Sequence, residues 1–171
     1  MFENCYVSEE LTYSQYLALL TLLYKKGVRE DIRNWRPISL SNTDIKILTK
    51  AFAERLRLVL PNIIDVEQTG CIKDRRIGHS IRLISDVFHQ MDDENIMLST
   101  DREKAFDRVE FPWLFYVLEK YGFGEYFINW MKILYKSLKS AVVTNGWTST
   151  YFSLTRGIRQ GDALSALLFI I

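Results

Sequence analysis

Apolar residues occur along this chain in two patterns, as short continuous runs and as positions spaced three or four residues apart. Two short runs, Leu17–Tyr24 and Trp35–Leu40, lie on either side of a polar, basic segment and are typical of strands. Because a Lys-Lys-Gly turn directly follows the first run, we predict a β-hairpin with a basic tip. Pro37 favours an edge position for the second strand.

Helical spacing follows in two segments. The first begins after Asn42 and Thr43, both suitable caps, and we expect it to continue to about Leu60, with Pro61 beyond its end. The second has apolar residues at 77, 81, 84, 88 and 91 and predicts a helix over 77–91. The segment 96–100 then predicts a buried strand that ends just before Asp101.

Strand and helix signals stay mixed in the C-terminal part of the chain. Pro112 suits the first turn of a helix that Gly122 would close, and a further helix is predicted around Trp130. Asn145-Gly146 favours a tight turn between strands at 142–144 and 148–154, and 164–171 predicts the start of another helix. Without a regular strand–helix–strand repeat, the pattern predicts an α+β fold rather than a doubly wound α/β fold.

Charge is distributed unevenly. The formal net charge of +1 does not by itself indicate a generic nucleic-acid binder. Positive charge is nevertheless concentrated in Lys25–Arg36 and Lys73–Arg82, each with a local balance of +3. These segments are either solvated loops or contacts for phosphate groups. No apolar run is long enough for a membrane helix, so we expect no membrane association.

Two segments carry candidate chemistry. Asp101 follows the predicted strand, and with Glu103 and Asp107 nearby it could hold a divalent cation, because magnesium prefers carboxylate oxygens together with substrate phosphates. Arg156–Gly161 combines polar side chains with two glycines, which allow the backbone to approach a ligand closely. Taken singly, a capping role for Asp101 is the commoner case, and an ordinary loop explains the glycine segment equally well.

Four motifs follow one another in order along residues 8–171. They are Lys25-Lys26-Gly27 with Asn34–Leu40, then residues 68–77, residues 101–109 (Asp-Arg-Glu-Lys-Ala-Phe-Asp-Arg-Val), and residues 156–169. In this order the chain resembles a truncated fragment of the reverse transcriptases of non-LTR (LINE-type) retrotransposons. The first two would be fingers motifs, and the last two would be palm motifs.

The resemblance implies a right-hand polymerase, with residues 1–94 as fingers and 95–171 as a partial palm that ends before the family's paired-aspartate motif. The implied activity is RNA-directed DNA polymerisation, in which a nucleotide is transferred from a dNTP to the 3′-hydroxyl of a DNA primer on an RNA template. Two Mg²⁺ ions would be the cofactors of this transfer.

The resemblance also implies roles on the metal and template sides. Asp101 would be the catalytic residue and metal ligand, and the backbone of Arg102 would help to hold metal and dNTP. Lys73 and Arg75 would contact the backbone of the template.

Five further residues would bind the dNTP. Lys26 and Arg36 would contact its triphosphate, and Phe106 would be the bulky gate that excludes a ribose 2′-hydroxyl. Gln160 would lie against the sugar and base, and Gly161 would allow close approach of the backbone.

The chain also departs from the family pattern. It ends at Ile171, before the paired aspartates, so we expect these 171 residues alone to be inactive as a polymerase. Asp162 and Ala163 stand where the family usually has Cys-Pro, and Asp74 stands in place of a usual glycine.

Three other interpretations stay open. A non-catalytic RNA-binding remnant of a retrotransposon polyprotein would not need Asp101. A structural remnant would expose apolar surface around Val142, Val143 and the last eight residues. A group II intron maturase shares the palm, although Asn-Trp-Arg-Pro-Ile-Ser-Leu favours the LINE branch. The sequence indicates no oligomeric state, and the family resemblance implies an intracellular location, either nuclear or cytoplasmic.

Overall fold

A mixed five-stranded sheet joins the two halves of the chain in this computed structural model, which describes residues 1–92 and 94–171. The strand order is β2-β1-β3-β4, and β5 pairs with β3. β1 and β2 are antiparallel, whereas β1 and β3 are parallel, so the sheet crosses the predicted boundary between residues 94 and 95. The strands are β1 Leu17–Tyr24, β2 Trp35–Ser41, β3 Lys139–Thr144, β4 Trp147–Thr148 and β5 Phe152–Ser153.

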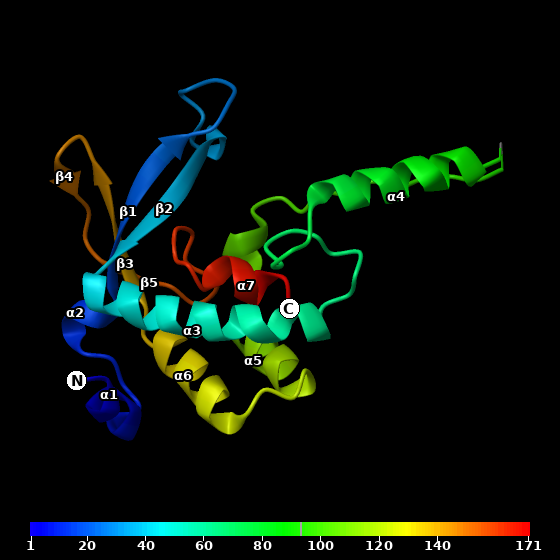
Figure 1. Cartoon of the computed structure of the whole chain (residues 1–171). Helices are drawn as coiled ribbons and strands as arrows, with labels where there is room; N and C mark the ends of the chain where they lie inside the picture. The colour runs from blue at the N-terminus through cyan, green and yellow to red at the C-terminus, as the bar shows by residue number, and fades with distance from the viewer. Residues whose placement is uncertain (93) are drawn as a thin grey trace.

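Helices cover one end of this sheet (Figure 1). Together with the mixed sheet they give an α+β fold, as predicted. None of the described helices is long and apolar enough to cross a membrane. The helices are α1 Phe2–Ser8, α2 Tyr13–Tyr16, α3 Thr43–Ile63, α4 Ile77–Gln90, α5 Phe111–Lys120, α6 Glu125–Tyr135 and α7 Ser165–Phe169, with 3-10 helices η1 Ile32–Asn34 and η2 Ala105–Arg108.

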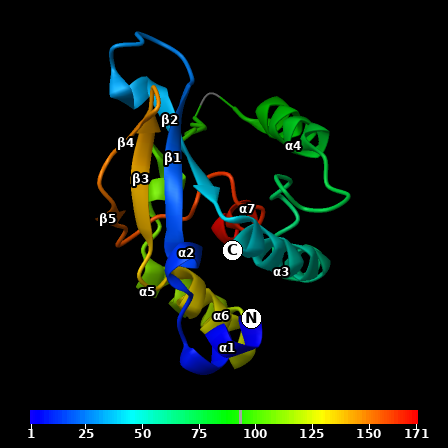
Figure 2. The same cartoon turned by 90° about the vertical axis from the view of Figure 1, so that its left-hand side faces the viewer.

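The predicted N-terminal hairpin is confirmed. β1 and β2 pair along their whole length, with Tyr24 opposite Trp35 at the outer end, and they project from the helical body (Figures 1 and 2). The rings of this outer pair meet edge to face, with centroids 5.5 Å apart. The basic residues between the strands therefore lie at an exposed tip.

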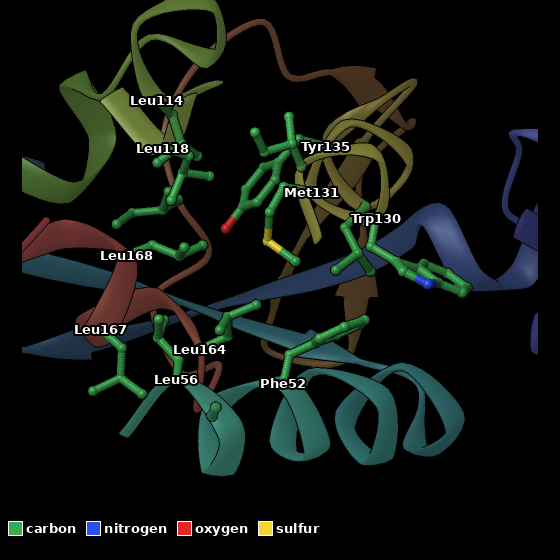
Figure 3. Close-up of a cluster of buried hydrophobic side chains, with 14 of the residues drawn as sticks. Phe52, Leu56, Leu114, Leu118, Trp130, Met131, Tyr135, Leu164, Leu167 and Leu168 are labelled. Carbon is green, nitrogen blue, oxygen red and sulfur yellow. The ribbon is translucent and has the colours of Figure 1, made fainter. Parts of the chain in front are cut away.

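The core lies between α3, α5, α6 and α7 (Figure 3). Phe52 of α3 meets Trp130 of α6 at a centroid distance of 5.8 Å, and Met131 and Leu118 are fully buried behind them. Because α7 supplies Leu164, Leu167 and Leu168 at its beginning and along its length, the chain just before it is tied to the core. That preceding segment is the glycine-containing loop Arg156–Gly161.

Several C-terminal predictions are confirmed as well. Pro112 lies in the first turn of α5, and Gly122 follows this helix with φ +78°. Asn145 and Gly146 both have positive φ between β3 and β4, as a tight hairpin turn requires. Val142 and Val143 are half-buried, and residues 164–171 are buried or half-buried. The exposed apolar surface that a structural remnant would show is therefore absent at these described residues.

One helix end differs from the prediction. Pro61 lies inside α3, which continues to Ile63, and the N–H of Ile64 still reaches the carbonyl of Leu60. A proline in a last turn removes one hydrogen bond and leaves carbonyl groups without helical partners. The side chain of Arg75 supplies donors to the carbonyls of Pro61 and Ile64 at this helix end, as described below.

The predicted strand 96–100 is wrong. The segment has no regular structure, and Ile96 and Leu98 are 92% and 83% exposed. A strand needs a partner, and both edges of β1 and of β3 are already occupied by other strands. An apolar run next to an acidic turn contains residues that are common in strands. It does not show whether another strand is available for the segment to pair with.

The helix predicted over 77–91 forms as α4, but it packs against little. Its apolar positions keep helical spacing, yet no residue of α4 is buried, and the helix points away from the body (Figures 1 and 2). Ile81 and Phe88 are 61% and 56% exposed. Tertiary contacts therefore contribute little to the stability of this helix.

Amide hydrogen exchange would test this difference between helices. An unsupported helix of 14 residues is marginally stable in water, so we expect the α4 amides to exchange at least about 100-fold faster than those of α6. Exchange measured by NMR or mass spectrometry gives the comparison. Equal protection of the two helices would contradict the exposed position of α4.

Candidate functional site

Main-chain hydrogen bonds join the loop Arg156–Gly161 to the segment around η2. The N–H of Gly157 donates to the carbonyl of Val109 at 2.7 Å, and the N–H of Ile158 donates to the carbonyl of Phe106 at 2.9 Å. Gly157 has φ +90°, and a Cβ at this position would lie 3.2 Å from the Cα of Asp107. Only glycine allows both the backbone conformation and the close approach.

The same loop meets the outer edge of β2 on its other side. The N–H of Ser39 donates to the carbonyl of Gln160 at 2.8 Å. Gly161 has φ +102°, and a Cβ there would lie 3.1 Å from the Cγ2 of Ile38. Because side chains two residues apart point to the same face of a strand, Arg36 and Ile38 share a face of β2, about 7 Å apart along the strand.

Gln160 lies where the loop crosses the edge of β2. Its Nε2 donates to the Oδ1 of Asp107 at 3.1 Å, and both residues are partly buried. They line a pocket together with Pro37 and Ser39, which point to the face of β2 opposite Arg36. Gln160 therefore lies on this pocket face of the β2 edge.

Phe106 is the fourth predicted dNTP-binding residue in this region. Its ring stacks on Phe169 of α7, with centroids 4.7 Å apart and an angle of 13° between the planes. Its carbonyl group accepts the hydrogen bond from Ile158. Main-chain hydrogen bonds thus place Phe106, Gln160 and Gly161 near the edge of β2, the strand that carries Arg36, and the roles of these four residues towards a nucleotide stay predictions.

Arg159, which the sequence did not indicate as a site residue, holds the loop to the segment before β1. Its side chain is buried, and Nη2 donates to the carbonyl of Tyr16 at 2.9 Å, just before β1 begins. Burial lowers the pKa of the Arg159 guanidinium, and nearby Asp162 partly offsets this effect. The sequence gives little signal for this role, because Arg159 stands in a loop of polar residues where an exposed side chain is usual.

Lys26 is exposed at the hairpin tip, beyond the last paired residues of β1 and β2. Hydrogen bonds from Arg33 hold the pKa of Asp31 below its ordinary value, and the Lys104 ammonium group lowers it further. Lys104 therefore lies near this tip, although it is far away in sequence.

The acidic residues in the segment 101–107 do not form a cluster of possible metal ligands. Asp101 is exposed, Glu103 forms an ion pair with Arg108 at 3.1 Å, and Asp107 accepts from Gln160. Among residues 1–92 and 94–171 there is no group of three or more side chains that could hold a metal ion. Asp101, the candidate metal ligand, thus belongs to no group of three or more possible metal ligands in the described chain.

The two predicted template-binding residues differ in their surroundings. Lys73 is exposed, whereas the guanidinium of Arg75 is occupied by carbonyl groups at the end of α3. Nη2 donates to Pro61 at 3.1 Å and Ile64 at 2.9 Å, and Nη1 donates to Gln68 at 2.8 Å and also to Asp65. Arg75 thus stabilises the helix end, and its contact with a template stays a prediction.

Asp74 has φ 64°, in the left-handed region. Glycine adopts this conformation without strain, and aspartate tolerates it better than most residues do. This backbone requirement gives a physical reason why glycine is usual at this position and why aspartate is an acceptable replacement.

Comparisons with known proteins agree with the resemblance in the sequence. The family model described as reverse transcriptase (RNA-dependent DNA polymerase) matches residues 23–171. The chain is 39% identical over 163 residues to the transposon TX1 uncharacterized 149 kDa protein of Xenopus laevis, covering 94% of this chain and 12% of that protein. Two Pol polyproteins of retrotransposable elements also match.

The first of these two is from the type-2 element R2DM of Drosophila melanogaster, with 25% identity over 93% of this chain and 15% of the relative. The second is from the type-1 element R2 of Popillia japonica, with 30% identity over 87% of this chain and 21% of the relative. The chain therefore spans about a fifth or less of the length of these relatives.

Arg75→Met would test the structural role of Arg75. We expect the free energy of unfolding to fall by about 2–3 kcal/mol, because hydrogen bonds from a charged donor to helix-end carbonyls would be lost. Lys73→Met is the matched control and should change stability by less than about 0.5 kcal/mol, because Lys73 is exposed. Urea unfolding followed by circular dichroism gives both values, and equal effects of the two substitutions would contradict this role.

Proposed function

We propose that this chain, which belongs to the reverse transcriptase family in its non-LTR (LINE-type) retrotransposon branch, contributes nucleotide-binding and template-binding parts of an RNA-directed DNA polymerase. The reaction joins the 3′-hydroxyl of a DNA primer to the α-phosphate of a dNTP and releases pyrophosphate, with RNA as the template. Residues 1–94 would be fingers and 95–171 part of the palm. The meeting of the Arg156–Gly161 loop, η2 and β2 is the observation that carries the proposal.

The electrostatics of the hairpin support a triphosphate site. Lys26 and Arg36 are exposed cations on one hairpin, and neither takes part in an ion pair in the described part of the chain. Arginine offers a planar set of donors for phosphate oxygens, and lysine offers a compact charge. The two residues would bind the triphosphate while Gln160 and Gly161 contact the sugar and base, with Phe106 as the gate against a 2′-hydroxyl.

The donor set fits one magnesium ion better than two. Magnesium is commonly held by one or two carboxylates together with substrate phosphates, which the exposed Asp101 and a bound dNTP would supply, with the backbone of Arg102 beside them. Bound there, the ion would neutralise charge on the phosphoryl oxygens. A second ion needs carboxylates that the described residues do not bring together. We therefore propose that these 171 residues alone bind nucleotide but do not polymerise it.

Binding of dTTP with Mg²⁺, measured by calorimetry, tests the nucleotide site. Arg36→Ala and Lys26→Ala should each weaken binding about tenfold, because each removes a charge-assisted contact with phosphate. Arg33→Ala is the control on the same hairpin, since its guanidinium is paired with Asp31 at 2.8 Å, and it should change binding less than about twofold. Equal losses in all three variants would indicate a general charge effect rather than a site.

A second candidate function is RNA binding without catalysis. The described residues form no group of three or more possible metal ligands, and this favours RNA binding because a metal-dependent transfer needs more ligands than Asp101 alone provides. Under this alternative Lys73 still contacts a template backbone, while Asp101 has no function.

Primer extension and RNA binding measured side by side distinguish the two functions. We expect no extension of a DNA primer on an RNA template by the 171-residue chain, with or without Asp101→Asn. RNA affinity should fall as salt rises, and Lys73→Ala should reduce the salt slope by about one. Robust extension that is lost in Asp101→Asn would overturn the proposed inactivity, and RNA affinity independent of salt would exclude the RNA-binding candidate.

A further inference from the structure

Asp107 is an acidic residue of η2 that the sequence names only as a neighbour of Asp101 at a possible cation site and that the proposed function does not use. It accepts the hydrogen bond from the Gln160 side chain at 3.1 Å, across 53 residues of sequence. Both residues are partly buried, so this contact lies within the site rather than in open solvent. The described part of the chain shows no salt bridge to Asp107.

The backbone around this contact is fixed on both sides. The N–H of Asp107 donates to the carbonyl of Lys104 at 3.0 Å, and the N–H groups of Gly157 and Ile158 bond to residues close to Asp107 in the chain. Gly157 has no Cβ, which brings the loop against the main chain of Asp107. The main chain of Gln160 is in turn bonded to Ser39. The main chain of Gln160 is therefore fixed, and the hydrogen bond to Asp107 fixes the orientation of its side chain.

The chemistry of the amide group defines the consequence. A glutamine side chain has one NH₂ donor group and one carbonyl acceptor, and its long chain has many rotamers in solution. When Asp107 accepts from Nε2, the amide is held in one orientation and Oε1 is turned away from the carboxylate. Oε1 and the second N–H then remain available for a ligand.

We propose that Asp107 is a positioning residue that holds the Gln160 amide in the orientation in which it contacts the sugar and base of the incoming nucleotide. The proposal rests on the proposed function, because it needs Gln160 to face a bound nucleotide. Asp107 acts through Gln160 and not as a metal ligand. Its contribution is therefore hydrogen-bond acceptance, which an uncharged asparagine retains, and not negative charge.

A double-mutant cycle on the 171-residue chain tests the proposal with dTTP and Mg²⁺ as the probe. Asp107→Ala should weaken binding about 5- to 30-fold, in the range of a coupled pair in direct contact. Asp107→Asn should stay within about threefold of the unchanged chain, because its side-chain oxygen still accepts from Gln160. In a Gln160→Ala background, Asp107→Ala should have no further effect.

NMR of side-chain amides gives a readout that does not depend on the nucleotide. The Gln160 NH₂ signal should shift in Asp107→Ala and keep its position in Asp107→Asn, while thermal unfolding shows that each variant is folded. If Asp107→Ala does not fold, the Asp107→Asn and Gln160→Ala variants still decide the case, since a metal-ligand role predicts that Asp107→Asn loses binding.

The outcomes separate this inference from the proposed function. Loss of binding in Gln160→Ala with unchanged or tighter binding in Asp107→Ala would overturn the positioning role and leave the nucleotide site standing. Equal losses from Asp107→Ala with and without the Gln160→Ala substitution would also overturn it, because Asp107 would then act independently of the amide. No detectable dTTP binding by the unchanged chain, or no effect of Gln160→Ala, would overturn both.

Discussion

The candidate site depends on main-chain hydrogen bonds that join three distant segments. Residues 157 and 158 bond to residues 109 and 106, and residue 160 bonds to residue 39. All of these hydrogen bonds join backbone groups. Side chains therefore affect the arrangement mainly by steric hindrance, where a larger residue would keep two segments apart. Gly157 and Gly161 have positive φ and no Cβ, and a side chain at either position would push apart the segments that the bonds hold together.

Burial stabilises the loop Arg156–Gly161 more than it stabilises the tip of the β1–β2 hairpin. The loop is tied to the core by Arg159 beneath it and by α7 directly after it. The hairpin tip is held mainly by local bonds, such as those from the Tyr24 hydroxyl to Gly27 and from the Asn34 amide to Val28. A nucleotide in this position would therefore meet a preorganised surface at its sugar and an exposed, cationic one at its phosphates.

The sequence predicts most of the local elements because their causes are local. The hairpin, α5 and the Asn145-Gly146 turn follow from apolar spacing, proline and glycine positions. The failures concern contacts between distant segments: residues 96–100 pair with no strand of the described sheet, and the carbonyl of Pro61 in the last turn of α3 accepts a hydrogen bond from Arg75. The resemblance supplied the candidate site residues, which stay predictions, and the bond between Asp107 and Gln160 depends on a loop crossing that no spacing within the sequence reveals.

The unpaired segment before Asp101 has a consequence for the chemistry. A catalytic carboxylate must be held at a defined place, and a strand just before it is one way to fix it. Here residues 96–100 pair with no strand of the described sheet, whereas Phe106 and Val109, a few residues later, are bonded in place. The part of the candidate site that we propose for the nucleotide is thus fixed by backbone hydrogen bonds, whereas the segment before Asp101 is not. The proposed nucleotide binding and nucleotide transfer would therefore make different demands on the chain, and its internal contacts suit the first better than the second.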